Sequence, residues 1–511
     1  MFKCVGFLLL SAVITRSYQL KKPNVLLILV DDLRPSLGVY GDKNAYTPNI
    51  DKLAKKSAIF TNAFAQQALC APSRNSLLTS RRPDSLHLYD FNSYWRDSVG
   101  NYTTIPQLFK ENGYLTYSVG KVFHPGASSN HTDDAKYSWS KKPYHPPTEK
   151  YKDAKVCVTR RGTLAQNLFC PVNLRQQPGG TLPDLESVHA AKEFLQYRNQ
   201  KTDPPFFLAV GFYKPHIPFK FPLEYLKYHH LDNITIPLNH YRSAFLPSVA
   251  WSPWIDIRKR DDIKAMNISF PFGRVPDRSI KKIIQHYNAA VTYIDELIGQ
   301  LLKNIDKNTI IVLTGDHGWS MGEHGGFSKY SNFDIATRVP LIVHVPDVIN
   351  FQSIKSELVE LVDLFPTLVD MTGVTDSLKT CSHTNLKLCT EGRSLAPLIT
   401  PYSEKNYSKF AVFTQYPRPG EFPTQKPNSD EPNLSDIQIM GYSIRTSQYR
   451  YTEWIQFNNT NFTPNWKHVY ARELYDHFID PDENMNLVGK PEMEQIATFL
   501  HNKLVLGWKY V

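Results

Sequence analysis

The sequence predicts an α/β fold, with a large, mostly parallel sheet sandwiched by helices and a smaller α+β subdomain at the C-terminus. Aliphatic runs at 24–30, 206–210, 309–313 and 339–345 are continuous, as in strands that are buried on both faces. Apolar residues spaced three and four apart over 283–301 predict an amphipathic helix between two of these strands. Strands that alternate with helices are typical of a parallel sheet covered on both sides.

The N-terminus predicts export. Residues 1–17 place one lysine before a short apolar run, which is the layout of a secretory signal peptide. No later segment has the roughly 18 uncharged apolar residues that a membrane helix needs, so we expect no membrane anchor. A lysosomal or extracellular glycoprotein is therefore expected, because the chain also carries eight Asn-X-Ser/Thr sites: Asn101, Asn130, Asn233, Asn267, Asn406, Asn433, Asn458 and Asn461.

Two parts of the mature chain differ in character. We predict a catalytic α/β domain over 22–402 and an α+β subdomain over 403–511, because a proline-rich stretch begins soon after residue 400. Two Tyr-, Ile- and Thr-rich strands are then expected around a turn at Ser447 and Gln448. The segment 491–504 predicts a final helix, and without a Gly/Ser linker the subdomain is expected to pack against the larger domain.

The charge of the chain permits a polyanionic partner. Its formal net charge is +10, but the basic residues are spread along the sequence rather than gathered in blocks. We therefore expect no nucleic-acid partner.

One of the six cysteines lacks a nearby partner. Cys4 is expected to leave with the signal peptide, and Cys70 stands alone in the sequence, which leaves open a reactive thiol, a modified residue, an intermolecular bridge or an inert buried side chain. The other four form two close pairs, each able to close a short disulfide loop: Cys157 with Cys170, and Cys381 with Cys389.

Acidic residues follow two of the predicted strands. Asp31 and Asp32 come directly after the first strand, and Asp316 and His317 follow the strand at 309–313. Ligand sites of parallel sheets lie beyond the carboxyl ends of the strands, and carboxylate oxygens suit Ca²⁺ or Mg²⁺. The plainer alternative is that the aspartates only cap a strand or a helix.

Basic residues and histidines follow other strand and loop ends. Lys121, His124, Lys214, His216 and Lys329 could together form a cage for a sulfate or phosphate group. Taken singly, each is more simply a solvated cation or a structural histidine.

The segment Cys70–Arg74, with Leu77 and Thr79, resembles the signature of the sulfatase family, whose cysteine is oxidised to formylglycine in the endoplasmic reticulum. Other family-like segments extend the resemblance over nearly the whole mature chain: 23–35, 47–74, 314–325 and 473–487. The sequence departs from the pattern at Ser80, where the family has glycine. If that position needs a positive φ, Ser80 costs about 1 kcal/mol of strain.

The resemblance implies a reaction and its cofactors. One Ca²⁺ would be held by Asp31, Asp32, Asp316 and the modified Cys70, with His317 at or beside the coordination sphere. One hydroxyl of the hydrated aldehyde would attack sulfur, and the sulfated hydrate would collapse to release sulfate. A formylglycine-generating enzyme would be a partner during biosynthesis.

The resemblance also assigns the basic residues. Arg74 would hold the hydrate and the ligand environment, and Lys121 and Lys329 would bind sulfate oxygens. His124 would orient or deprotonate the hydrate, and His216 would protonate the leaving oxygen, although the two histidines could exchange roles.

Within the family, the segments 88–96, 120–134 and 209–219 are most similar to members that remove the 2-O-sulfate of iduronate from heparan and dermatan sulfate. Trp319 is a further candidate for the sugar site, with ordinary loop packing as its alternative. Two other functions remain open: an inactive homologue that binds sulfated glycans, and a phosphatase or phosphonate hydrolase of the same alkaline-phosphatase-like superfamily.

Overall fold

The structure is a computed structural model that describes residues 22–159, 161–198, 202–382, 386–400 and 407–511. The predicted signal peptide and the predicted domain boundary between 402 and 403 lie outside these residues. Within them, no helix combines the length and apolarity needed to cross a bilayer.

A seven-stranded sheet forms the centre of the larger part, in the order β13-β2-β12-β9-β1-β7-β3. All neighbouring pairs are parallel except those that β12 makes with β2 and β9, so the predicted mostly parallel sheet is confirmed. The predicted aliphatic strands correspond to β1, β7, β9 and β12. In chain order the seven strands are β1 (Asn24–Val30), β2 (Ala58–Phe64), β3 (Leu115–Gly120), β7 (Phe206–Phe212), β9 (Thr309–Gly315), β12 (Arg338–His344) and β13 (Ser353–Glu360).

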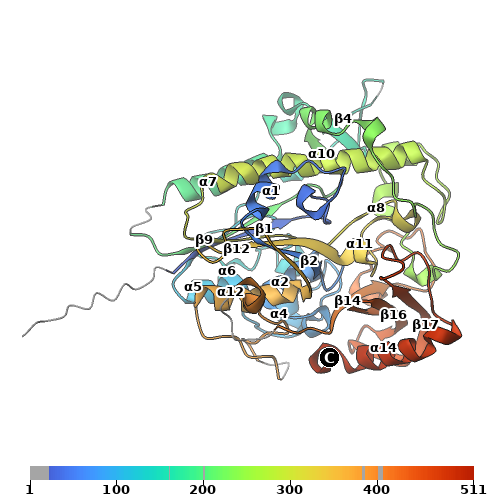
Figure 1. The fold of residues 1–511 in the computed structure, drawn as a ribbon. Helices are drawn as coiled ribbons and strands as arrows, with labels where there is room; N and C mark the ends of the chain where they lie inside the picture. The colour runs from blue at the N-terminus through green and yellow to red at the C-terminus, as the bar shows by residue number, and fades with distance from the viewer. Residues whose placement is uncertain (1–21, 160, 199–201, 383–385, 401–406) are drawn as a thin grey trace, which may run out of the picture.

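Helices cover both faces of the sheet (Figure 1). On one face lie α1 (Pro48–Ala54), α7 (Pro183–Gln196) and the long α10 (Asp277–Leu302); on the other lie α2 (Cys70–Thr79), α5 (Ile105–Glu111) and α12 (Leu364–Thr372). Alternate residues of β1 enter two separate apolar clusters. Burial on both faces is therefore why its sequence is continuously apolar.

The C-terminal part is a four-stranded antiparallel sheet of β14 (Ala411–Arg418), β15 (Ile439–Thr446), β16 (Tyr449–Asn458) and β17 (Thr463–Asp476), packed with α14 (Glu494–Leu506). The predicted hairpin and final helix are confirmed. The sequence analysis missed β14, which ends in a Pro-Arg pair, and β17, whose first part is mostly polar and exposed. An apolar cluster that joins Leu69 and Tyr330 to Tyr416 and Trp454 packs this sheet against the larger part.

Both predicted cysteine pairs form disulfides, Cys157–Cys170 and Cys381–Cys389. Among the described residues Cys70 is the free cysteine, and its side chain is completely buried.

Candidate active site

Four adjacent strands deliver the candidate residues to one edge of the sheet. The strands β9, β1, β7 and β3 are neighbours and run parallel, so their carboxyl ends meet. Asp31 and Asp32 follow β1, Asp316 and His317 follow β9, Lys121 follows β3, and the loop after β7 carries His216. The sequence predicted this convergence, and the topology produces it.

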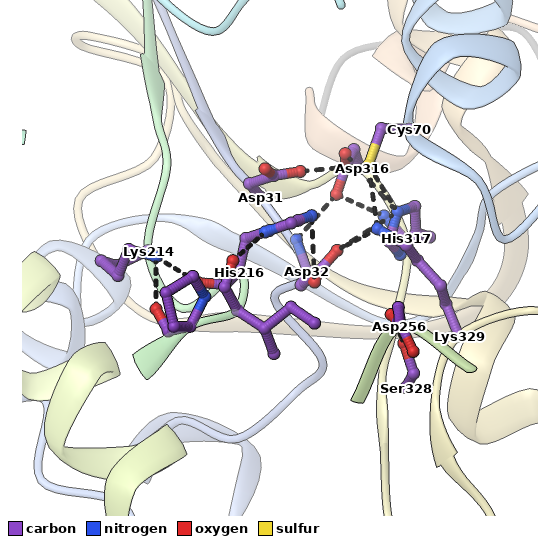
Figure 2. Close-up of polar contacts among 12 residues, drawn as sticks. Asp31, Asp32, Cys70, Lys214, His216, Asp256, Asp316, His317, Ser328 and Lys329 are labelled. Carbon is purple, nitrogen blue, oxygen red and sulfur yellow. Dashed lines mark hydrogen bonds and ion pairs between the residues drawn. The ribbon is translucent and has the colours of Figure 1, made fainter. Parts of the chain in front are cut away.

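Cys70 is the first residue of α2, and its sulfur points toward the residues that follow β1 and β9 (Figure 2). Its Sγ is 3.3 Å from Asp31 Oδ1, 3.3 Å from His317 Nε2 and 3.1 Å from Lys329 Nζ. Burial and the neighbouring Asp31 carboxylate raise the pKa of the thiol well above its usual range. An unmodified Cys70 therefore stays protonated and is a poor nucleophile.

Arg74 lies one turn further along α2 and joins two of the carboxylates. Its Nε donates to Asp316 Oδ2 at 2.8 Å, and its Nη2 donates to Asp31 Oδ1 at 3.2 Å. The guanidinium also donates to the backbone oxygen of Val122 at 3.2 Å and to that of Lys121. Through these hydrogen bonds the fully buried Arg74 holds α2 against the ends of β1, β3 and β9.

Two lysines complete the set of charges. Lys121 Nζ lies 2.6 Å from Asp31 Oδ2, and Lys329 Nζ lies 2.9 Å from Asp32 Oδ1. Burial alone would raise the pKa of Asp31, but Lys121, with His216 and Arg74, holds it well below its ordinary value. At Asp32, burial raises the pKa more than Lys329 lowers it, and the neighbouring Asp31 carboxylate raises it further.

The donor set fits a hard divalent cation. Asp31, Asp32, Cys70 and His317 each offer one ligand atom, and these atoms lie within 4.8 Å of one another. Asp316 stands at the edge of the group, because Arg74 takes one of its oxygens while the other accepts the backbone N–H groups of Asp32 and His317 at 3.0 Å each. Two of the four donors are carboxylate oxygens, and Asp316 adds a third carboxylate beside them; such hard oxygen ligands suit Ca²⁺ or Mg²⁺.

The two candidate catalytic histidines come from different loops. His216 Nε2 lies 4.0 Å from Asp32 Oδ2, while its Nδ1 contacts the backbone oxygen of Ile217 at 2.7 Å. His124 packs against the Phe91 ring at 4.4 Å, and its buried Nδ1 has no hydrogen-bond partner in the described residues. Burial lowers the pKa of both rings; Lys152 adds to this effect at His216, and Lys121 adds to it at His124.

Two residues that the sequence suggested for the site, Lys214 and Trp319, have structural roles instead. The Lys214 ammonium does not enter the cage: it donates to the backbone oxygens of His216 and of Pro218, the latter at 2.8 Å (Figure 2). It therefore holds the loop that carries His216. Trp319 is fully buried and stacks on Tyr287 at 5.5 Å, so its alternative, ordinary packing, is correct.

The departure from the family pattern at Ser80 has a visible consequence. Ser80 ends α2 with φ 52° and ψ 40°, so the left-handed conformation that a glycine would favour is adopted by a residue with a side chain. The Ser80 hydroxyl donates to Val362 O at 2.6 Å and lies 2.8 Å from Thr390 Oγ1. These contacts offset part of the strain.

The sequence analysis overlooked two residues beside the pocket. Tyr287 donates its hydroxyl to the backbone oxygen of Asp32 at 2.7 Å, but in the sequence it belongs to the apolar stripe of α10. Lys152, whose charge adds to the lowering of the pKa of His216, ends the segment 147–152, where two Lys and one Glu give no pattern that singles it out.

Comparison with known proteins identifies the family. The sulfatase family profile matches residues 23–374, and a profile named N-sulphoglucosamine sulphohydrolase, C-terminal, matches residues 322–507. The chain belongs to the sulfatase family. This sulfatase is therefore a hydrolase of sulfuric esters.

Two curated relatives of this sulfatase are named iduronate 2-sulfatase. The human protein (Homo sapiens) is 50% identical over 496 residues, which cover 90% of this chain and 89% of the relative. The mouse protein (Mus musculus) is 48% identical over the same span and with the same coverage.

Solved structures agree on the fold. A phosphonate monoester hydrolase of Agrobacterium radiobacter gives a TM-score of 0.68 at 19% identity and covers 95% of each chain. A protein solved with its substrate D-glucosamine-2-N,6-O-disulfate gives a TM-score of 0.67 at 21% identity, and the match covers 96% of this chain and 98% of that chain. At such identities the likeness concerns the α/β architecture and not the substrate.

Proposed function

We propose that this sulfatase removes the 2-O-sulfate of iduronate in heparan and dermatan sulfate, using one Ca²⁺ and a formylglycine made from Cys70. The observation that carries the proposal is the position of Cys70 at the start of α2, against Asp31, His317 and Lys329. The iduronate 2-sulfatase relatives, at 48% and 50% identity, support the choice of substrate.

The metal would be held by Asp31, Asp32 and Asp316, with residue 70 and His317 beside them. Hydrated formylglycine supplies a hydroxyl nucleophile, and the cation acts as a Lewis acid that favours its ionised form. Three carboxylates face three permanent cations here, so a divalent ion leaves the pocket with net positive charge. Such a pocket attracts an anionic sulfate ester.

The lysines would bind the sulfate group. Lys121 and Lys329 each give one N–H to an aspartate and have two more; Lys329 directs one of these at Cys70 Sγ, 3.1 Å away. Arg74 is engaged by Asp31, Asp316 and backbone oxygens, so its role is to fix the ligand carboxylates and α2.

The histidines would move protons. In the free pocket burial lowers the pKa of both rings, which favours their neutral form. A bound sulfate ester places negative charge near His216, which favours its protonated form and lets it donate a proton to the leaving alcohol. His124 would orient the hydroxyl groups at position 70 or accept a proton from them.

The proposed location is the secretory pathway, with a lysosomal or extracellular destination. Six of the eight glycosylation sites expose their asparagine, Asn433 is partly exposed, and Asn406 lies outside the described residues. The six are Asn101, Asn130, Asn233, Asn267, Asn458 and Asn461.

The alternative functions are less well supported. An inactive glycan-binding homologue would not need to keep every charged group of the pocket in contact around Cys70. A phosphatase of the same superfamily would be expected to carry Ser or Thr as nucleophile where this chain has Cys70.

The decisive experiment is mass spectrometry of the tryptic peptide 57–74 from protein secreted by a host that makes formylglycine. We expect the aldehyde at residue 70. The same preparation should release sulfate from a 2-O-sulfated iduronate disaccharide, and should act far less on an aryl phosphate.

An unmodified thiol together with no sulfate release would refute the enzyme proposal. An aldehyde with turnover of aryl sulfate but not of the disaccharide would keep the sulfatase and overturn the iduronate substrate.

A further inference from the structure

The loop between β7 and β8 (Phe219–Pro222) carries His216, and the course of this loop decides where the imidazole ring lies. His216 Nε2 lies 4.0 Å from Asp32 Oδ2, at the edge of the candidate active site. Its Nδ1 contacts the backbone oxygen of Ile217 at 2.7 Å, so the ring is tied to the backbone of its own loop. Whatever fixes this backbone therefore fixes the ring as well.

The start of the loop is held by Asp184, which lies in the first turn of α7 and is only 1% exposed. Its Oδ1 accepts the backbone N–H of Tyr213 at 2.7 Å, and its Oδ2 accepts the backbone N–H of Lys214 at 3.2 Å. Both carboxylate oxygens are thus used on two consecutive residues, directly after the end of β7. Hydrogen bonds to an ionised acceptor are roughly twice as strong as those between neutral groups.

Further hydrogen bonds connect these two residues to His216. The backbone N–H of His216 donates to Tyr213 O at 3.0 Å, so the residue that Asp184 holds in turn holds the histidine. The Lys214 ammonium donates to the backbone oxygens of His216 and, at 2.8 Å, of Pro218, which supports the far side of the loop (Figure 2). Asp184 therefore reaches His216 through Tyr213 and Lys214.

We propose that Asp184 is a positioning residue, whose carboxylate holds the loop so that His216 can deliver its Nε2 proton to the leaving oxygen as the S–O bond breaks. The inference rests on the proposed function and extends it to a residue of α7. An amide at position 184 would accept one of the two N–H groups but turn its own N–H₂ group toward the other. Asp184→Asn should therefore loosen the loop while it preserves the size of the side chain.

The test varies the leaving group, because a poor leaving group needs the proton and a good one does not. A sugar alcohol leaves as a strongly basic alkoxide unless it is protonated, whereas 4-nitrophenolate is stable without a proton. General acid catalysis contributes roughly 10²–10⁴-fold to a rate, so a misplaced His216 should lose part of that factor. We expect Asp184→Asn to lower kcat about thirtyfold on a 2-O-sulfated iduronate disaccharide, but less than about threefold on 4-nitrophenyl sulfate.

Asp295 provides a matched control elsewhere in the chain. It is also 1% exposed, and its carboxylate accepts the backbone N–H groups of Asn49 at 3.1 Å and of Ile50 at 2.7 Å. It lies on α10 and holds α1 rather than the loop of His216. Asp295→Asn should therefore lower the melting temperature as Asp184→Asn does, yet change the ratio of the two activities by less than about twofold. Both activities fall together when less enzyme is folded, so their ratio reports the position of His216.

Two further variants ask whether the effect passes through His216. Lys214→Met removes the ammonium but keeps the backbone N–H, and it should shift the ratio in the same direction as Asp184→Asn. In a His216→Ala background, where the acid is already gone, Asp184→Asn should lower the disaccharide activity by less than about threefold further.

Equal losses on the two substrates in Asp184→Asn, or losses that multiply in the double variant, would overturn the proposal. A wild-type enzyme that hydrolyses neither sulfate ester would instead count against the proposed function itself.

Discussion

Two buried clusters in this molecule use the same kinds of residue for different ends. The pocket around Cys70 brings together Asp31, Asp32 and His317. At the junction with the C-terminal sheet, Asp334, His477 and Glu483 also converge closely enough to hold an ion, and we call them the seam cluster. By residue type alone, both are candidate metal sites.

In both clusters each carboxylate has a cationic partner, but in the pocket the carboxylates also act on one another. In the seam cluster each carboxylate has its own cation: Arg445 Nε lies 3.0 Å from Asp334, and Arg450 pairs with Glu483. Burial would raise the pKa of Glu483, but Arg450 and His477 hold it far below the usual range. In the pocket, burial and Asp31 instead raise the pKa of Asp32.

The comparison teaches that crowding of like charges, and not the presence of acids and histidines, distinguishes the candidate catalytic cluster. Ion pairs without such crowding stabilise the fold, whereas carboxylates that are forced together favour a cation.

The largest effect is expected from Asp32→Asn, which should lower kcat roughly a thousandfold because it removes a metal ligand. In chelator the variant should lose less stability than Asp31→Asn, because burial and Asp31 disfavour the Asp32 charge even though Lys329 loses its partner. Sulfate release and thermal melts in EGTA measure the two effects.

Asp31→Asn is the matched control for that stability effect. It should also abolish activity, but its melting temperature in EGTA should fall, because Lys121 at 2.6 Å and Arg74 at 3.2 Å lose their partner. Equal losses of stability in the two variants would contradict the view of a crowded pocket.

In the seam cluster the expected effects are reversed. Glu483→Gln leaves Arg450 buried without a charged partner and should cost about 3 kcal/mol of unfolding free energy, measured by urea denaturation. Activity well below the melting temperature should remain near that of wild type. Glu492→Gln, at an exposed position of the same subdomain, should change neither quantity.

Asp430 combines features of the two clusters, because its carboxylate accepts hydrogen bonds but also lies near another carboxylate. It accepts hydrogen bonds from Ile255 N–H at 2.6 Å and from the Ser252 hydroxyl at 3.1 Å, and burial together with Asp256 raises its pKa to about 7. Between pH 4 and 7 the folded state holds a proton that the unfolded chain has lost, so stability falls as pH rises, by up to about 1.4 kcal/mol per pH unit.

Asp430→Asn should therefore flatten the decrease in melting temperature between pH 4.5 and 7. The exposed Asp436→Asn serves as control and should keep the wild-type profile. Identical profiles for the two variants would mean that Asp430 is already ionised in the folded protein.

Much of the pocket could be predicted because its residues follow strands. Asp31 comes directly after a continuous apolar run, Asp316 and Lys121 directly follow β9 and β3, and parallel topology brings such positions together. The direction of a long side chain is not encoded in that pattern, so Lys214 was expected in the cage although its ammonium turns to backbone oxygens. β12 runs antiparallel to both of its neighbours, β2 and β9, although its apolar sequence resembles that of the parallel strands. Its direction therefore depends on how the chain connects the strands.

The smallest effect is expected at Ser80, which ends the helix that begins at Cys70. Its hydroxyl contacts Val362 O and Thr390 Oγ1, so its polar group is satisfied like the charges of the seam cluster. Its backbone, however, is strained at φ 52°. Ser80→Ala keeps the strain and loses both contacts, and should cost about 1–2 kcal/mol. Ser80→Gly loses the same contacts but relieves the strain, so it should be about 1 kcal/mol more stable than the alanine variant. Urea denaturation of the two variants checks this order, and an alanine variant as stable as the glycine variant would mean that the backbone here carries no strain.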